Sequence, residues 1–150
     1  MMRGRELVAQ GSDRTLGILA HASIAFGLLG VGSLIGIAIN AVIWLRAGRS
    51  EYVAVQARQA GLYQLSVLLI NVAIAGAWVA ILVFVFMGES EIGPGKLSFR
   101  QIAAGMWLAL IPLWLIWYLV TIGYGLYAAS RIARGKPFTY PLVGGSTRPR

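Results

Sequence analysis

The chain has 150 residues, of which 58% are hydrophobic and only 12% are charged. That composition leaves too little polar surface for a soluble domain of this length and indicates an integral membrane protein. The formal net charge of +8 comes from basic residues beside apolar stretches, which favours anionic lipid over nucleic acid as the partner.

Three stretches carry no charge at all, and together they define the expected membrane domain. The thirteen basic and five acidic residues all lie outside 15–45, 59–88 and 101–130. Crossing the hydrocarbon core takes about 20 apolar residues, and an ionised group at mid-depth is costly. Each stretch is long enough to cross. The first is also too long for the apolar core of a signal peptide, so we expect it to be retained.

The first stretch is unusual because four glycines interrupt its centre: Gly27, Gly30, Gly32 and Gly36. Glycine weakens a helix interior by about 1 kcal/mol relative to alanine, so a break or close helix packing is expected there. Two alternatives follow: two short helices at 15–29 and 33–45 that form a hairpin, or one long tilted helix.

The distribution of basic residues favours the hairpin. With a hairpin, eleven basic residues lie on the cytoplasmic face and two outside, whereas a single crossing gives eight against five. We therefore predict an all-α polytopic protein with four transmembrane helices and both termini in the cytoplasm. Three spans with one long first helix remain the alternative.

Two longer helices are predicted at 51–87 and 98–133. Ser50 is the expected N-cap of the first, with Glu51 in its first turn. Pro112 lies inside the second and removes one backbone hydrogen bond, so a kink is expected there.

The predicted organisation is a cytoplasmic segment at 1–14, a membrane domain at 15–134 and a cytoplasmic tail at 135–150. The expected location is the bacterial inner (plasma) membrane, with several passes. Five basic residues near the cytoplasmic boundaries are expected to contact lipid headgroups: Arg46, Arg49, Arg131, Arg134 and Lys136.

Polar residues inside the apolar stretches are the candidate functional residues. Five of them fall within an arc of about 140° on one predicted helix: Gln56, Gln59, Tyr63, Gln64 and Asn71. This polar stripe either makes hydrogen bonds between helices or lines a polar path or docking face. His21 and Asn40 pose the same choice in the first stretch, and packing is the favoured interpretation for both.

Four segments together resemble the Tic20-like family of small bacterial membrane proteins, once classified only as a domain of unknown function: 14–21, 43–46, 56–66 and 137–142. The resemblance extends over about 14–143. It implies four helices with both termini on one side, and a distant relationship to a component of a plastid protein-import channel.

The expected function is that of a structural, accessory or assembly subunit that packs against other membrane proteins or against itself. The alternative is a component of a translocation or channel-like assembly. No enzymatic activity, cofactor or metal site is expected, because the chain lacks cysteine and its apolar stretches contain no acidic residue and only one histidine.

Overall fold

The computed structural model describes residues 11–29, 32–48, 50–87 and 98–141. These residues form helices and no strand, which confirms the all-α class. They divide into two compact units. Unit 1 contains the described residues up to Leu68 and from Thr121 onward, and unit 2 contains those from Leu69 to Val120.

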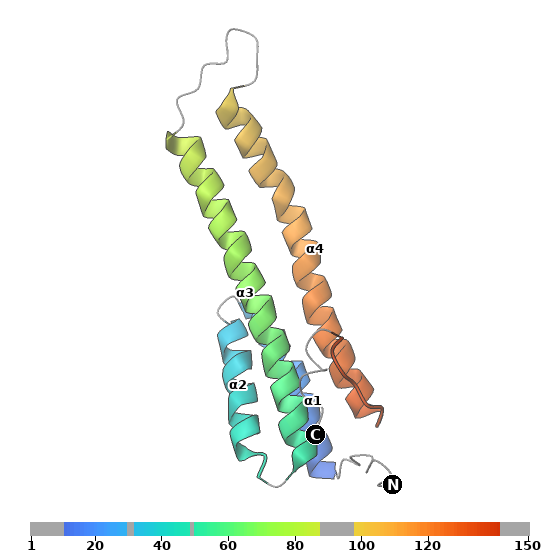
Figure 1. Cartoon of the computed structure of the whole chain (residues 1–150). Helices are drawn as coiled ribbons and strands as arrows, with labels where there is room; N and C mark the ends of the chain where they lie inside the picture. Colours follow the sequence, from blue (N-terminus) through green and yellow to red (C-terminus); the bar gives the residue numbers. More distant parts are fainter. Residues whose placement is uncertain (1–10, 30–31, 49, 88–97, 142–150) are drawn as a thin grey trace. The chain divides into compact units, whose positions relative to one another are not determined.

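Five helical elements follow one another along the chain (Figure 1): α1 Gly11–Ala22, the 3₁₀ helix η1 Ser23–Leu29, α2 Gly32–Arg46, α3 Glu51–Met87 and α4 Phe99–Ala133. The predicted bounds of α2, α3 and α4 agree with these to within one residue. α3 and α4 both contribute residues to both units.

The predicted helix at 15–29 is wrong in form, because the α-helix starts earlier and gives way to η1 at Ser23. The Ser23 hydroxyl donates a hydrogen bond of 2.7 Å to the Ala20 carbonyl. Serine side chains that bond a preceding carbonyl compete with the α-helical backbone pattern, which accounts for a change of helix type at this position.

The number of membrane crossings predicted from the sequence is not confirmed. Two helical segments are long and apolar enough to cross a bilayer, Glu51–Val85 in α3 and Gln101–Ala133 in α4. Within α2, the apolar segment Ser33–Arg46 is shorter than a span. The described residues therefore contain two candidate spans, together with a break between short helices where the glycine-rich centre predicted one.

Both long helices begin with serine caps. The Val53 amide donates to the Ser50 hydroxyl at 3.4 Å, which confirms Ser50 as the N-cap of α3. At α4 the Ser98 amide donates to the Gln101 side chain at 2.9 Å, and the Gln101 amide donates to the Ser98 hydroxyl at 3.2 Å. This reciprocal pair is a capping box, which fixes the start of α4.

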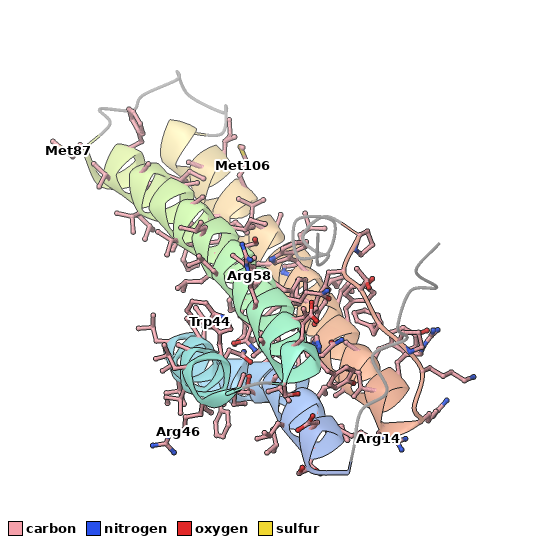
Figure 2. All side chains as sticks on the ribbon, turned by 60° about the horizontal axis from the view of Figure 1, so that its bottom comes forward. Arg14, Trp44, Arg46, Arg58, Met87 and Met106 are labelled. Carbon is pink, nitrogen blue, oxygen red and sulfur yellow. The ribbon has the colours of Figure 1, made fainter. Side chains whose placement is uncertain are left out.

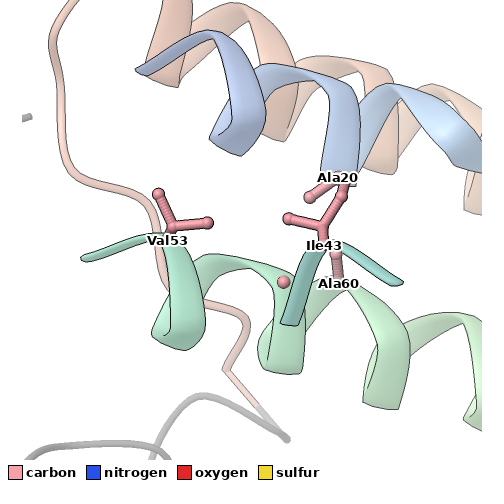
Figure 3. Close-up of a cluster of buried hydrophobic side chains, with 5 residues drawn as sticks. Ala20, Ile43, Val53 and Ala60 are labelled. Atoms are coloured by element: carbon pink, nitrogen blue, oxygen red, sulfur yellow. The ribbon is translucent and has the colours of Figure 1, made fainter. Parts of the chain in front are cut away.

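In unit 1, α1 and α2 pack against the first turns of α3 (Figure 3). The core combines Ala20 of α1 and Ile43 of α2 with small residues of α3, namely Val53, Ala57 and Ala60. The small side chains allow the helices to approach closely.

The C-terminal end of α4 is closed by a Schellman motif. Gly135 has a φ of 71°, and the amides of Gly135 and Lys136 donate to the carbonyls of Ile132 and Arg131 at 2.9 and 3.0 Å. Glycine adopts this left-handed conformation without a steric penalty.

α1 also contacts this end of α4. The Arg14 guanidinium donates from Nε to the Ile132 carbonyl at 3.0 Å, and from Nη2 to the Ala133 carbonyl. α1 therefore supplies a positive charge at the negative end of the α4 dipole.

Arg14→Lys should loosen the last turn of α4, because lysine cannot reproduce the two-nitrogen contact. A loss of about 1–2 kcal/mol of local stability corresponds to roughly five- to thirtyfold faster amide exchange. Hydrogen exchange at Gly135 and Lys136 measures this effect. Arg134→Lys is the matched control, since Arg134 is exposed. Equal exchange in the two variants would contradict the role of Arg14.

Unit 2 consists of residues 69–87 of α3 and 99–120 of α4. The Trp114 indole donates to Asn71 Oδ1 at 3.0 Å, and the Trp78 ring lies 5.6 Å from Trp107 and 5.7 Å from Trp114. α4 continues through the exposed Pro112 as one helix to Ala133. A cavity of about 270 Å³ is lined only by apolar and tryptophan side chains: Ile74, Ala77, Trp78, Leu110, Leu113, Trp114 and Trp117.

Candidate functional site

The most connected group of polar side chains is a buried network in unit 1, centred on His21. This residue is 1% exposed. Its Nε2 lies 2.9 Å from Gln56 Oε1 and its Nδ1 lies 3.0 Å from the Tyr140 hydroxyl. The network therefore joins α1, α3 and the segment that follows α4.

The partners determine the direction of each hydrogen bond. A carbonyl oxygen only accepts, so Nε2 of His21 carries a proton and donates to Gln56. A charged ring without an acidic partner is costly in a buried site, so the ring is neutral and Nδ1 accepts from the Tyr140 hydroxyl. Burial, with the nearby Tyr63 and Tyr124, raises the pKa of Tyr140 far above its usual value, which keeps this donor protonated.

A second group of polar contacts is centred on Ser23, where η1 begins. The Ser23 hydroxyl accepts from Gln64 Nε2 at 2.9 Å and from Asn40 Nδ2 at 3.1 Å. Asn40 Nδ2 also lies 3.1 Å from the Gly36 carbonyl. These bonds join η1, α2 and α3 through side chains that are all buried.

The fit around Ser23 requires glycine at position 36. A Cβ atom there would lie 2.5 Å from Gln64 Oε1 and 2.8 Å from the Ser23 carbonyl oxygen. For Gly36 the sequence left open a helix break or close helix packing, and the structure shows the second: Gly36 lies inside α2 and permits the close approach of η1 and α3. Gly27 is also buried, and Gly32 is the first residue of α2, whereas Gly30 lies outside the described residues.

The tail segment after α4 completes the network, whereas the sequence predicted only a cytoplasmic tail at 135–150. Phe138 and Tyr140 are 8% and 2% exposed. The Tyr140 ring stacks on Tyr63 at 4.2 Å between centroids. The alternation of aromatic residues between Pro137 and Pro141 is the one signal that marked the segment as more than a solvated tail.

The predicted polar stripe is divided between different environments. Gln56, Gln59 and Gln64 are buried in unit 1, and the Tyr63 hydroxyl donates to the Thr121 carbonyl at 3.0 Å. Asn71 belongs to unit 2, where it accepts from Trp114. The structure thus joins Gln56 to His21, and it joins Gln64 and Asn40 through Ser23.

The basic residues expected at lipid headgroups also differ from one another. Arg46, Arg134 and Lys136 are exposed, and the side chain of Arg46 projects outward from the end of α2 (Figure 2). Arg131 is half-buried and donates to the Pro137 carbonyl at 3.3 Å, so it binds the tail segment. Arg49 lies outside the described residues.

The chemistry available to the network is hydrogen bonding between neutral groups. Among the residues that the structure describes, no group of three histidine, cysteine, aspartate or glutamate side chains could hold a metal ion. The Asn40 Oδ1 and Gln64 Oε1 atoms are buried and accept no hydrogen bond from any described residue. The arrangement holds elements together, since the bonds of His21 to Gln56 and Tyr140, and of Ser23 to Asn40 and Gln64, join different segments of the chain.

A comparison with known protein families identifies the chain more closely. The family model MamF_MmsF, described as the magnetosome magnetite crystal formation protein family, matches residues 12–146. The chain belongs to this family. No curated protein and no solved structure gives a significant match. The residues of the MamF/MmsF match include all five described helical elements except the first residue of α1.

Membership of the MamF/MmsF family overturns the Tic20-like resemblance, which is wrong. That resemblance depended on the order and spacing of short segments rich in small and apolar residues. Such segments recur in many membrane proteins because helix packing in lipid favours them, so they discriminate poorly between families. The translocation alternative that came with the resemblance has no support from the family match.

Proposed function

We propose that this protein is an accessory protein of the magnetosome membrane that acts in magnetite crystal formation through contacts with other membrane proteins. The observation that carries the proposal is the family match over residues 12–146. The role is non-catalytic in this proposal, because the buried polar residues of unit 1 bond one another and hold the helices together.

The candidate spans supply the surface for such contacts. Among the residues of α3 and α4 in unit 2, many large apolar side chains are exposed, including Leu69, Phe84, Met106 and Leu113. In a bilayer these side chains meet either lipid or another transmembrane helix. Association between helices in lipid depends on packing and hydrogen bonds, and helices with exposed apolar faces can take part in it.

Both termini are cytoplasmic in this proposal, in keeping with the excess of basic residues at 1–14, 46–58 and 131–150. Reporter fusions after residues 93 and 150 test the orientation. Activity of a cytoplasmic reporter at 150 and of an exported reporter at 93 is the expected pattern, and the reverse pattern would reject it.

The function is tested by deleting the gene in a magnetosome-forming host and measuring magnetite crystals by electron microscopy. We expect altered crystal size or number, restored by the wild-type chain and by Gly123→Ala, because a Cβ at Gly123 meets no atom within 4 Å. Gly36→Ala should restore crystals less well, since it strains the packing of unit 1.

The location of the protein in the magnetosome membrane is tested separately from its effect on crystals. Magnetosomes isolated on a magnetic column should carry the tagged protein, and a control protein of the plasma membrane should be depleted from them. Normal crystals in the deletion strain, or absence of the protein from isolated magnetosomes, would contradict the proposal.

A further inference from the structure

The described residues between 11 and 46 form a helical hairpin whose second arm, α2, is too short to cross a bilayer. Its arms, α1 with η1 and then α2, contact each other through Ser23, which lies 3.4 Å from the Gly36 carbonyl and 3.1 Å from Asn40 Nδ2. α2 has 15 residues. At about 1.5 Å per residue it extends for roughly 22 Å, against a hydrocarbon core of about 30 Å.

Both ends of the hairpin carry charge and belong to the same face. Asp13 and Arg14 lie in the first turn of α1, and Arg46 ends α2. The Ser50 hydroxyl, directly before α3, donates to Asp13 at 2.6 Å, and Arg14 bonds the last carbonyls of α4. The hairpin therefore enters and leaves a bilayer at the face where α3 begins and α4 ends.

Between these ends, the outward surface of the hairpin is apolar. On α2, Leu34 is 58% exposed and Leu45 is 75% exposed, and Ile35, Val42 and Trp44 are also exposed. On the other arm, Leu19 and Phe26 are exposed. An uncharged surface of this kind is compatible with acyl chains, and exposure of it to water would be unfavourable.

The polar side chains of the hairpin face the interior of unit 1. His21, Ser23 and Asn40 are buried and bonded within unit 1. Polar groups at membrane depth must be satisfied within the protein, and these contacts meet that requirement for His21, for Ser23 and for the Asn40 amide nitrogen.

We propose that the segment 11–46 inserts into the bilayer from one face only and occupies mainly the leaflet at that face. The protein therefore prefers curved membranes in which this leaflet lies on the convex side. Helices with their side chains are about 10–12 Å wide, so two of them add roughly 200 Å² to the area of that leaflet. A bilayer relieves such a difference in leaflet area by curving, with the expanded leaflet on the convex side. The partner of the hairpin is thus a curved lipid surface. This proposal does not depend on the proposed function in magnetite crystal formation.

The test uses thin membrane tubes pulled from giant vesicles of phosphatidylcholine and phosphatidylglycerol that contain the full chain. The chain has no cysteine, so Ser146→Cys provides a single labelling site. A membrane-impermeant maleimide dye labels only molecules whose tail, and hence whose hairpin base, faces outward. A permeant dye followed by an external quencher reports the opposite orientation.

Tail-outward molecules should be enriched on tubes, severalfold at the smallest radii, and tail-inward molecules should be depleted. The two orientations of one protein are thus each other's control, and no destabilised variant is needed. Equal partitioning of both orientations, or enrichment of both, would overturn the proposal.

Depth provides a second measurement. A fluorophore on Leu34→Cys should be quenched by nitroxides deep in the acyl chains, whereas one on Leu45→Cys should be quenched by nitroxides near the headgroups. Both positions are exposed, so neither substitution disturbs the core. Labelling of Leu34→Cys by an impermeant reagent from the face opposite the tail would show a full crossing and would also overturn the proposal.

Discussion

His21→Leu should lower the free energy of unfolding by about 3–5 kcal/mol. It leaves Gln56 Oε1 and the Tyr140 hydroxyl buried without a partner, at a cost of about 1–3 kcal/mol each. Leucine also does not reproduce the packing of the planar imidazole ring. Leucine is similar in size to histidine, so the cavity left behind is small. The substitution should also release the tail. Thermal unfolding in detergent micelles measures the first effect, and limited proteolysis after Tyr140 measures the second.

The partner variant separates hydrogen bonding from packing. Tyr140→Phe keeps the stack on Tyr63 and removes only the hydroxyl, so we expect a smaller loss of about 1–2 kcal/mol. Because the two groups bond each other, the double variant should cost less than the sum of the two single variants. Tyr127→Phe serves as the control, since Tyr127 is 48% exposed. Additive losses would show that His21 and Tyr140 do not act together.

Gly36→Ala should destabilise unit 1 by about 1–2 kcal/mol. The added methyl group meets Gln64 Oε1 at 2.5 Å and the Ser23 carbonyl oxygen at 2.8 Å, and the backbone atom cannot turn aside as a side chain could. Overpacking of this kind costs about 1–3 kcal/mol or more, and the better helix propensity of alanine offsets about 1 kcal/mol of that. A lower melting temperature in micelles is the expected observation.

Gly123→Ala is the matched comparison for this substitution. It lies in the same unit and also within a helix, but the added methyl group meets no atom within 4 Å. Because only the higher helix propensity of alanine acts at this position, the free energy of unfolding should rise by up to about 1 kcal/mol. If both variants had the same melting temperature, the close approach at Gly36 would not govern packing.

Much of the helical framework could be predicted because its signals are local. The uncharged stretches predicted the bounds of α3 and α4, Ser50 predicted the start of α3, and the glycine-rich centre predicted a break between short helices. Helix starts depend on the cap and on the residue three positions later, so Ser50 and the pair of Ser98 and Gln101 could be recognised without a structure.

The polar network was only partly predictable because its partners are distant in sequence. His21 and Tyr140 are 119 positions apart. The angular arc on α3 grouped Gln56 with Gln64, which are both buried in unit 1, but it also included Asn71, whose partner is Trp114 in unit 2. Helical periodicity specifies which residues share a face, but it does not specify which helix covers each turn of that face.

The change from α1 to η1 escaped prediction for another reason. A serine in an apolar run is compatible with either helix type, and the outcome at Ser23 depends on Gln64 and Asn40 as well as on Ala20. Tertiary contacts decide such local choices, whereas propensity only weights them.

The contacts between the two ends of the chain have a consequence for its biosynthesis. Arg14 reaches the end of α4 and His21 reaches Tyr140, so α1 acquires these partners only after α4 and Tyr140 have left the ribosome. Until then the hairpin lacks part of its polar pairing, and an incomplete chain is open to surveillance by membrane proteases. The closing of these two contacts thus requires both α4 and Tyr140, and chains truncated before Tyr140 should be short-lived in the cell.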